Sequence, residues 1–439
     1  MKYFDLKAIL IQTMILLSAT YFCVGSSTID AGKQKESSSE SVMRHIFPPT
    51  IMLDPSALVK AKKNFQNGNT SALRIDINQL LSEADSLLHE KASSVTDKIE
   101  IPPSGDKHDF LSLAPYRWPD PAKKDGLPYI GRDGSVNPEI YNIPDKKNLD
   151  QLTHAVTVLS SAYYFTDSPK YASKTKELLR VWFLDDSSKM NPNLKYSEMV
   201  RGKNNSQPAG IMAGRNLTDI IDSIRLIQNY PEWTSDDNSG IKSWFTRYLS
   251  WLLNSTSGRN EAQKMNNHGT YYYIQVSDIA LFLNRTDLAR SIIGSFMRPP
   301  SLSSFMAPEL SIYSKIQPDG RQLFELQRSR ALDYSMFNLL GLFKLANLGE
   351  HLELDLWNFR TGKDPLLQKA LDFLIPYLTK KQDWPYSQST QINLALASDL
   401  VCQAIAHYPQ RKPMYSESYN FLARNTAFIH MDNLLPCVS

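Results

Sequence analysis

Residues 150–183 read DQLTHAVTVLSSAYYF, then TDSP, then KYASKTKELLRVWF. Apolar residues recur in the first run at positions i, i+3, i+4 and i+7; these are Leu152, Ala155, Val156 and Leu159. This spacing places side chains on one face of an amphipathic helix. The Asp-Ser-Pro turn signal at 167–169 ends one helix and starts the next. The stretch therefore predicts a helical hairpin, with helices over 150–165 and 170–183.

The same pattern recurs along the chain. Residues 270–283 and 287–296 form a second predicted pair, again joined by a short Asn/Thr/Asp turn. Apolar residues at helical spacing also mark the segments around 217–227, 339–345 and 394–401. No run of short alternating strands occurs. Repeated helical hairpins predict an all-α fold, either a solenoid or a closed (α/α) toroid.

The N-terminal residues predict that the protein is secreted. Lys2 and Lys7 precede or flank an apolar run that ends near Cys23, which is typical of a signal peptide over residues 1–25. A membrane anchor is the alternative, but polar residues interrupt the run, which is shorter than the ~20 residues needed to span a bilayer. A polar, Ser-rich lead-in over 26–45 is predicted to be disordered. Residues 46–439 are predicted to form one catalytic domain.

Glycosylation and cysteine usage agree with a secreted protein. Five N-x-Ser/Thr acceptor sites follow the leader, at Asn69, Asn204, Asn216, Asn254 and Asn284. In an oxidising compartment Cys402 and Cys437 could pair as a disulfide; the alternative is two free thiols. Three cysteines without histidine spacing predict no zinc site. We expect a monomer with no metal and no cofactor.

Charge narrows the class of ligand. The net charge is +3 and 21% of the residues are charged, without the basic blocks of a nucleic-acid-binding protein. A mildly basic protein can still concentrate positive potential in one cleft and attract an acidic substrate.

One long segment, 101–144, breaks the helical pattern. It contains eight prolines and five aromatic residues, including Tyr116 and Trp118. Loops of this length inside a compact domain are usually functional or disordered, and disordered segments are poor in aromatics. The segment is therefore predicted to be a wall or lid over a cleft.

Polar residues that could carry chemistry form two clusters. Asn266-Asn267-His268 precedes a predicted helix, and the free N–H groups of a helix N-terminus favour anions. The simpler interpretation is an Asn cap beside an ordinary His. The second cluster runs from Gln317 to Tyr334. If 325–334 is helical, Glu325 and Arg328 share a face and Arg330 lies one turn before Tyr334. A nearby Arg would lower the pKa of Tyr334. A surface ion pair and a core Tyr are the alternative.

Together the two clusters suit the removal of the C5 proton of a uronate. A carboxylate stabilises the neighbouring carbanion poorly, so an enzyme must neutralise it and supply a base. Asn267, His268 and an Arg could neutralise the carboxylate. Tyr334 could act as base and then return a proton to the leaving oxygen. The chemistry needs no metal.

Four stretches of the sequence resemble the alginate-lyase superfamily of helical-toroid polysaccharide lyases. They are 104–121, 266–272, 317–320 and 325–334. The resemblance implies an (α/α) toroid, an incomplete barrel of helical hairpins, and an acidic polysaccharide such as alginate or glucuronan as the substrate. It implies that Asn267 and His268 neutralise the carboxylate and that Tyr334 moves the proton, with His268 sharing the base role for some sugars.

The resemblance leaves the roles of some residues open. The segment 325–334 is one residue shorter than in the best-known bacterial members, so either Arg328 or Arg330 could bind the carboxylate; we prefer Arg328. Asn266 is a further candidate for sugar contact. The segment that matches the family's mobile loop offers three more candidates, Tyr116, Arg117 and Trp118.

Two other functions remain open from the sequence. A glycoside hydrolase on a similar toroid would need two opposed carboxylates, and Glu139, Glu198 and Glu325 are candidates. A non-catalytic carbohydrate-binding or cell-wall protein is the third possibility.

Overall fold

The structure is a computed structural model that describes residues 47–69, 77–203, 207–298 and 311–424. The predicted signal peptide, the lead-in, Asn204 and Cys437 lie outside these residues, so the proposed cleavage and the Cys402–Cys437 bond stay predictions. Among the described helices, none combines the length and the apolar character needed to cross a bilayer.

The described elements are mainly helices. Two helices precede the first predicted hairpin, α3 (Pro55–Gln66) and α4 (Ile77–Leu87). The α-helices after residue 144 are α5 (Asp145–Thr166), α6 (Pro169–Phe183), α7 (Leu217–Ile227), α8 (Ser235–Asn254), α9 (Thr256–Ala262), α10 (Asn267–Phe282), α11 (Thr286–Phe296), α12 (Ile312–Lys315), α13 (Leu323–Leu326), α14 (Ala331–Glu350), α15 (Leu366–Leu378), α16 (Leu394–His407) and α17 (Lys412–Ala423). The 3-10 helices along the chain are η2 (Val95–Asp97), η3 (Pro138–Asn142), η4 (Pro208–Asn216) and η7 (Pro409–Arg411).

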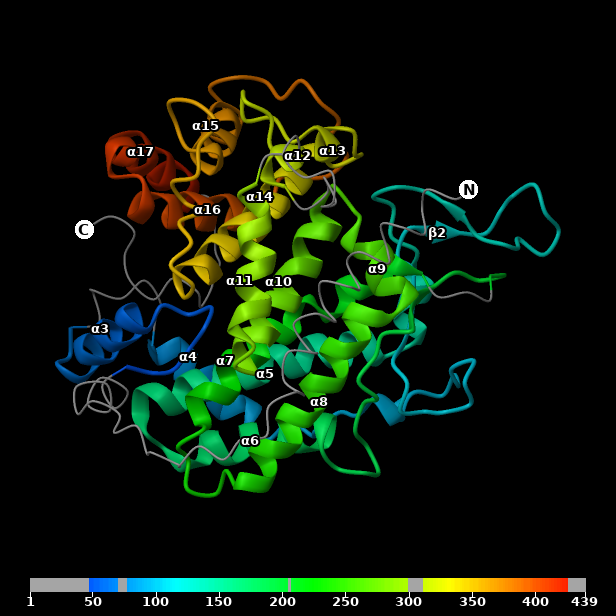
Figure 1. The fold of residues 1–439 in the computed structure, drawn as a ribbon. Coiled ribbons are helices and arrows are strands. Elements are labelled where there is room, and N and C mark those ends of the chain that lie inside the picture. The colour runs from blue at the N-terminus through cyan, green and yellow to red at the C-terminus, as the bar shows by residue number, and fades with distance from the viewer. Residues whose placement is uncertain (1–46, 70–76, 204–206, 299–310, 425–439) are drawn as a thin grey trace, which may run out of the picture.

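The helices form two layers of a toroid. In the inner layer α5 contacts α7, α7 contacts α10, α10 contacts α14 and α14 contacts α16. Four of these inner helices also pack on an outer partner: α5 on α6, α10 on α11, α14 on α15 and α16 on α17 (Figure 1). The predicted all-α toroid of hairpins is confirmed. The predicted helices are present with ends that shift by up to five residues.

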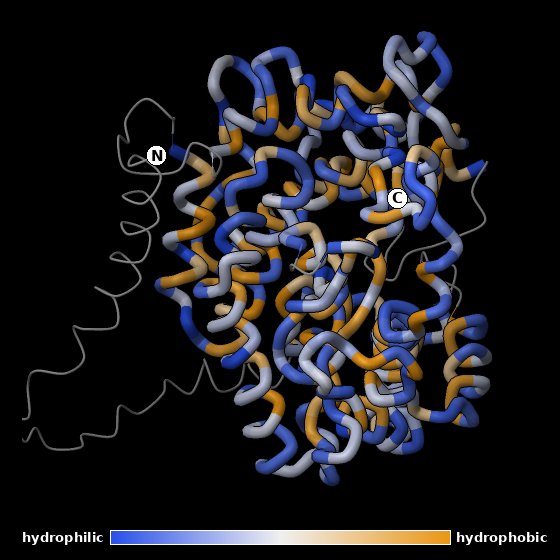
Figure 2. Tube along the Cα trace, turned by 90° about the vertical axis from the view of Figure 1, so that its right-hand side faces the viewer, coloured by the Kyte–Doolittle hydropathy of each residue, from blue (hydrophilic) through white to orange (hydrophobic). Residues whose placement is uncertain are grey.

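Position in the toroid explains the burial pattern. Inner helices α10 and α14 touch two inner neighbours and an outer partner, so buried residues occur on all their sides. Most other helices bury one face only, and Figure 2 shows hydrophobic and hydrophilic stretches alternating along the chain. One apolar core runs from Ile51 to Leu422. It includes the ring cluster of Phe183, Trp244, Phe245 and Tyr248 between α6 and α8.

The segment 101–144 forms two small sheets with distant parts of the chain. Strand β1 (Leu111–Leu113) pairs in parallel with β4 (Tyr196–Met199), with an irregular register. Strand β2 (Arg117–Trp118) pairs antiparallel with β3 (Ile130–Gly131) in a hairpin that projects beside the α9 end of the toroid (Figure 1). The predicted wall is therefore a pair of short sheets.

The prediction of a continuous helix over 325–334 is wrong. Helix α13 ends at Leu326 and α14 begins at Ala331. Between them the backbone pairs with a distant strand-like segment, since Ala331 N–H donates to the carbonyl of Ser387 (2.9 Å) and Ser389 N–H donates to that of Ser329 (2.9 Å). These long-range bonds replace the local helical ones.

The N-terminal segment is fastened to the toroid by a buried carboxylate. Asp222 on α7 accepts the backbone N–H groups of Ile51, Met52 and Leu53 at 2.6, 2.9 and 2.7 Å. The Asp222→Ala substitution removes this acceptor and leaves buried donors without a partner. We expect it to lower the free energy of unfolding by about 3 kcal/mol, measured by urea denaturation. Asp236→Ala, at an exposed position on α8, should change it little.

Candidate active site

A cavity of about 440 Å³ opens where five parts of the chain meet. Its walls come from the β2–β3 hairpin and its flanks, strand β4, the 3-10 turn η4, the start of α10, and the α13–α14 connection with the first turns of α14. The functional groups at its surface are Tyr116, Arg117, Arg132, Asp133, Glu198, Arg215, Asn267, His268, Arg328 and Tyr334. All four predicted catalytic residues therefore line one cavity.

The start of α10 places Asn267 and His268. Asn266 is the N-cap, and its side-chain oxygen accepts the N–H of His268 (3.3 Å). The helix entry lies tight against the end of α9, because a Cβ at Gly269 would lie 1.9 Å from the carbonyl oxygen of Lys264. The simple capping interpretation thus holds for Asn266, which does not line the cavity, while the next two side chains do.

Two buried carboxylates behind the cavity orient these side chains. Glu325 accepts both the backbone N–H (2.6 Å) and the side-chain amide (2.8 Å) of Asn267. The Nδ1–H of His268 donates to the fully buried Glu261 (2.6 Å), which leaves Nε2 as the nitrogen available to a substrate. Burial acts to lower the pKa of His268, but the hydrogen bond and charge of Glu261, with the charge of Glu198, outweigh it and raise that pKa.

The Glu261→Gln substitution should change the pH dependence of any catalysis at this site. Removing the Glu261 charge lowers the pKa of His268, so the imidazolium is lost at a lower pH. If the imidazolium binds substrate, the alkaline limb of kcat/KM should shift to lower pH. Steady-state rates across pH, together with the NMR titration of the His268 ring, measure both changes. An unchanged limb with a lowered His268 pKa would contradict this role for the charge.

Tyr334 lies on the first turn of α14. Its hydroxyl forms a hydrogen bond with the hydroxyl of Tyr116 (3.0 Å), and the Arg328 guanidinium carbon lies 3.9 Å from its ring centroid. Burial and the Tyr116 contact raise the pKa of Tyr334 despite the charge of Arg328. The expectation of a lowered pKa is therefore wrong, because loss of solvation outweighs one neighbouring cation.

The two candidate arginines have different surroundings. Arg328 lines the cavity and holds Asp133 through Nε (3.2 Å) and Nη2 (2.7 Å). Arg330 pairs with Asp333 on its own helix (2.8 Å) and does not line the cavity. The structure thus brings Arg328, and not Arg330, together with Asn267, His268 and Tyr334.

The hairpin contributes Tyr116 and Arg117 to the cavity, but Trp118 faces elsewhere. Its indole N–H donates to the carbonyl of Ser135 (2.9 Å), and Arg132 lies over its ring. Trp118 stabilises the hairpin, so its role as a sugar contact is not supported by its position.

Sequence reasoning missed several residues of the site. Glu198 was considered only as a hydrolase carboxylate, and Arg215, Asp133 and Glu261 were not considered. Glu261 lies at the end of α9, seven residues before His268, and this short separation is a signal that the sequence offers. Asp133 and Arg215 come from segments whose proximity depends on the long-range fold.

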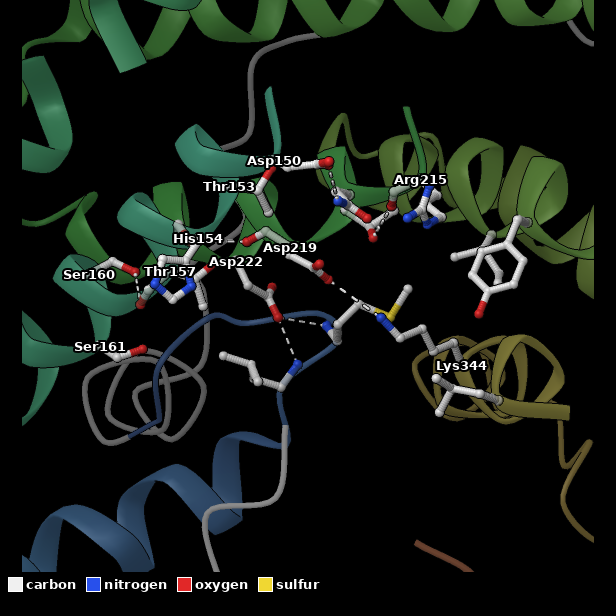
Figure 3. A pocket seen from close by; sticks show the side chains of 18 of the residues that line it. Asp150, Thr153, His154, Thr157, Ser160, Ser161, Arg215, Asp219, Asp222 and Lys344 are labelled. Carbon is white, nitrogen blue, oxygen red and sulfur yellow. Dashed lines mark hydrogen bonds and ion pairs between the residues drawn. The ribbon is translucent and has the colours of Figure 1, made fainter. Parts of the chain in front are cut away.

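Two further cavities adjoin the site. One of about 910 Å³ shares Glu198 with it and is lined by Lys146, Lys147, Gln151 and His154. The other, of about 390 Å³, shares Arg215 and contains polar residues of α5 and α7 with Lys344 of α14 (Figure 3). Asn216 lines this second cavity, is only partly exposed and donates to Asp150 (3.0 Å). Asn69, Asn254 and Asn284 are exposed.

The carboxylates do not form a hydrolase pair. Of the three candidates only Glu198 lines the cavity, since Glu325 is buried behind Asn267 and Glu139 accepts the Tyr129 hydroxyl (2.9 Å). Asp133 is the other acid at its surface. Burial opposes ionisation of Asp133, but Arg328 donates to both of its carboxylate oxygens and Ser329 N–H donates to one of them, and these hydrogen bonds lower the pKa of Asp133 to about 2. Asp133 is thus held in an ion pair and is not placed to activate a water or attack a sugar. Among the described residues, no group of His, Cys, Asp or Glu is arranged to hold a metal.

Comparison with known proteins agrees with this geometry. The family model described as alginate lyase matches residues 94–384. The chain belongs to the alginate lyase family. It is accordingly a polysaccharide lyase. A crystal structure of an alginate lyase from Bacteroides ovatus is similar, with 34% identity and a TM-score of 0.78 over 87% of this chain and 97% of that one.

A second alginate lyase, from Sphingomonas species A1, shares the fold at 17% identity, with a TM-score of 0.52 over 84% of this chain and 92% of that one. Among curated proteins no match is found. The family match covers every cavity residue named above.

Proposed function

We propose that the protein is a secreted lyase that cleaves a uronic-acid polysaccharide, such as alginate or glucuronan, by β-elimination. The observation that carries the proposal is the meeting of Asn267, His268, Arg328 and Tyr334 around one cavity. Three of these side chains offer hydrogen-bond donors and the fourth is a phenol. This set matches the needs of C5 proton removal beside a carboxylate.

The donors neutralise the substrate carboxylate. His268 presents Nε2 because Glu261 holds Nδ1, and its raised pKa favours the charged imidazolium. Asn267 is fixed by Glu325, which leaves one amide hydrogen of its side chain for the substrate. Donors oriented before the reaction cost no reorganisation when charge develops on the carboxylate.

Tyr334 moves the proton. Its neutral phenol suits donation to the leaving glycosidic oxygen, and its ionised form removes the C5 proton. Arg328 beside the ring is the group whose charge stabilises the phenolate. Arg328 contributes charge in this way, and its remaining guanidinium hydrogens are available for the carboxylate while Asp133 holds one edge.

The compartment and modification follow the sequence. We propose that residues 1–25 direct secretion, that the enzyme is a monomer, and that glycans attach at the exposed sites Asn69, Asn254 and Asn284.

A panel of uronate polymers tests the proposal. We expect the purified enzyme to release products that carry a new C4–C5 double bond and absorb in the ultraviolet, in proportion to the new reducing ends. Polymannuronate, polyguluronate and glucuronan should be compared with a neutral glucan as control. Reducing ends without ultraviolet absorbance would indicate hydrolysis, and binding without cleavage would indicate a carbohydrate-binding protein.

A further inference from the structure

Glu198 has an unusual position in the site. It lines both the 440 Å³ cavity that contains His268 and Tyr334 and the adjoining 910 Å³ cavity that contains Lys146 and Lys147. Pro115 and Glu198 are the two residues that line both cavities, so the Glu198 side chain lies at their boundary. In the described part of the chain, no hydrogen bond or ion pair from another side chain holds its carboxyl group.

The backbone of Glu198 is held in a costly conformation. Its φ of 51° lies in the left-handed region, which residues with a Cβ seldom adopt. The irregular β1–β4 register lies at this point, and Glu198 N–H donates to the hydroxyl of Ser112 (2.9 Å), which fixes the distortion. Such a bulge turns a side chain in a new direction, and strain that a fold maintains is typical of functional residues.

The charges around Glu198 come from four elements. Arg215 of η4, Lys146 of α5 and His268 of α10 favour its ionised form, and Glu261 of α9 opposes it. Lys146 is itself paired with Asp150 of α5 (2.5 Å). Burial is the largest influence, and it raises the pKa of Glu198 to about 7. A uronate carboxylate arriving in the cavity would add negative charge and favour the protonated form further.

We propose that Glu198 contacts the substrate as a neutral carboxylic acid, donating a hydrogen bond to a uronate carboxylate at the junction of the two cavities. A carboxylic acid kept neutral by its surroundings can act as such a donor. The ionised form would repel the same carboxylate, so binding of a polyuronate takes up a proton at Glu198. This inference rests on the proposed lyase function.

The test measures proton uptake on binding. The Tyr334→Phe variant, which should bind without cleaving, and the Tyr334→Phe/Glu198→Gln double variant are titrated with a saturated mannuronate tetrasaccharide. Calorimetry in two buffers of different ionisation enthalpy, at pH values on either side of 7, gives the number of protons taken up. We expect uptake above pH 7 in the first variant and a smaller uptake after Glu198→Gln.

The competing explanation predicts the opposite change. If His268 alone takes up the proton, Glu198→Gln removes a charge that raises the His268 pKa, so uptake above neutral pH should stay the same or increase. Either of these results would overturn the role of Glu198.

Affinity provides the second measurement. The amide of Glu198→Gln still donates a hydrogen bond and cannot ionise, so its affinity above pH 7 should exceed that of the parent. Glu198→Ala should bind roughly tenfold more weakly than the parent below pH 7, where the parent is protonated, and this difference should shrink above pH 7. Glu353→Gln is the matched control, because Glu353 also has a positive φ (57°) but is exposed and lines neither cavity.

The outcome for Glu198 can be separated from that for the lyase function. If the native enzyme forms unsaturated products but proton uptake is unchanged by Glu198→Gln, only the Glu198 proposal fails. If no uronate polymer is cleaved and the tetrasaccharide does not bind, both proposals fail.

Discussion

The Tyr334→Phe substitution is expected to lower kcat by roughly 10²–10⁴-fold, the usual contribution of a positioned general acid or base. Phe keeps the ring that contacts Arg328 and loses only the hydroxyl that pairs with Tyr116. Substrate binding depends on other groups, so the dissociation constant of a uronate oligosaccharide should change little. The initial rate of ultraviolet-absorbing product and calorimetric binding measure the two effects separately.

Two controls make this result specific. Tyr377→Phe removes a hydroxyl from α15, outside the cavities, and should leave kcat unchanged. Thermal unfolding of Tyr334→Phe should resemble that of the native enzyme, because the hydroxyl makes one hydrogen bond in a partly buried place. If the kcat of Tyr334→Phe equalled that of the native enzyme, Tyr334 would be excluded as the proton carrier. His268 would then be the remaining candidate.

The helical hairpins could be predicted because their signals are local. The spacing of apolar residues and the turn at 167–169 lie within one stretch of sequence, and α5 and α6 appear there with nearly the predicted ends. The prediction of a helix over 325–334 was wrong because the backbone there depends on a long-range contact. Pairing with residues 387–389 interrupts the helix, and no local pattern shows a partner nearly sixty residues away.

The residues of the site also fall into those that local sequence reveals and those that only the long-range fold brings together. Asn267, His268 and Tyr334 could be proposed because they stand in recognisable local motifs. Glu198 becomes notable only when β4 meets β1 and turns its side chain into the cavity. The pKa of Tyr334 illustrates a further limit. A neighbouring Arg is visible in the sequence, whereas burial, which reverses the direction of the shift, depends on the whole fold.

The His268→Gln substitution is expected to lower kcat by about 10²–10³-fold, the cost of removing one oriented donor to developing charge. Gln is preferred to Ala because its amide can still donate to the buried Glu261. Without a donor, that carboxylate would remain buried and unpaired, at a cost of about 3–5 kcal/mol in stability. His89→Gln, at an exposed position, is the control.

Comparing polymers then separates two roles for His268. A group that only neutralises the carboxylate affects every uronate equally, because all of them present the same carboxylate beside C5. A group that also removes the C5 proton affects most the polymer whose proton faces it, and mannuronate and guluronate present that proton on opposite sides. Equal losses on polymannuronate and polyguluronate would assign His268 to neutralisation alone. A much larger loss on one of them would assign it the base role for that sugar and restrict Tyr334 to the other.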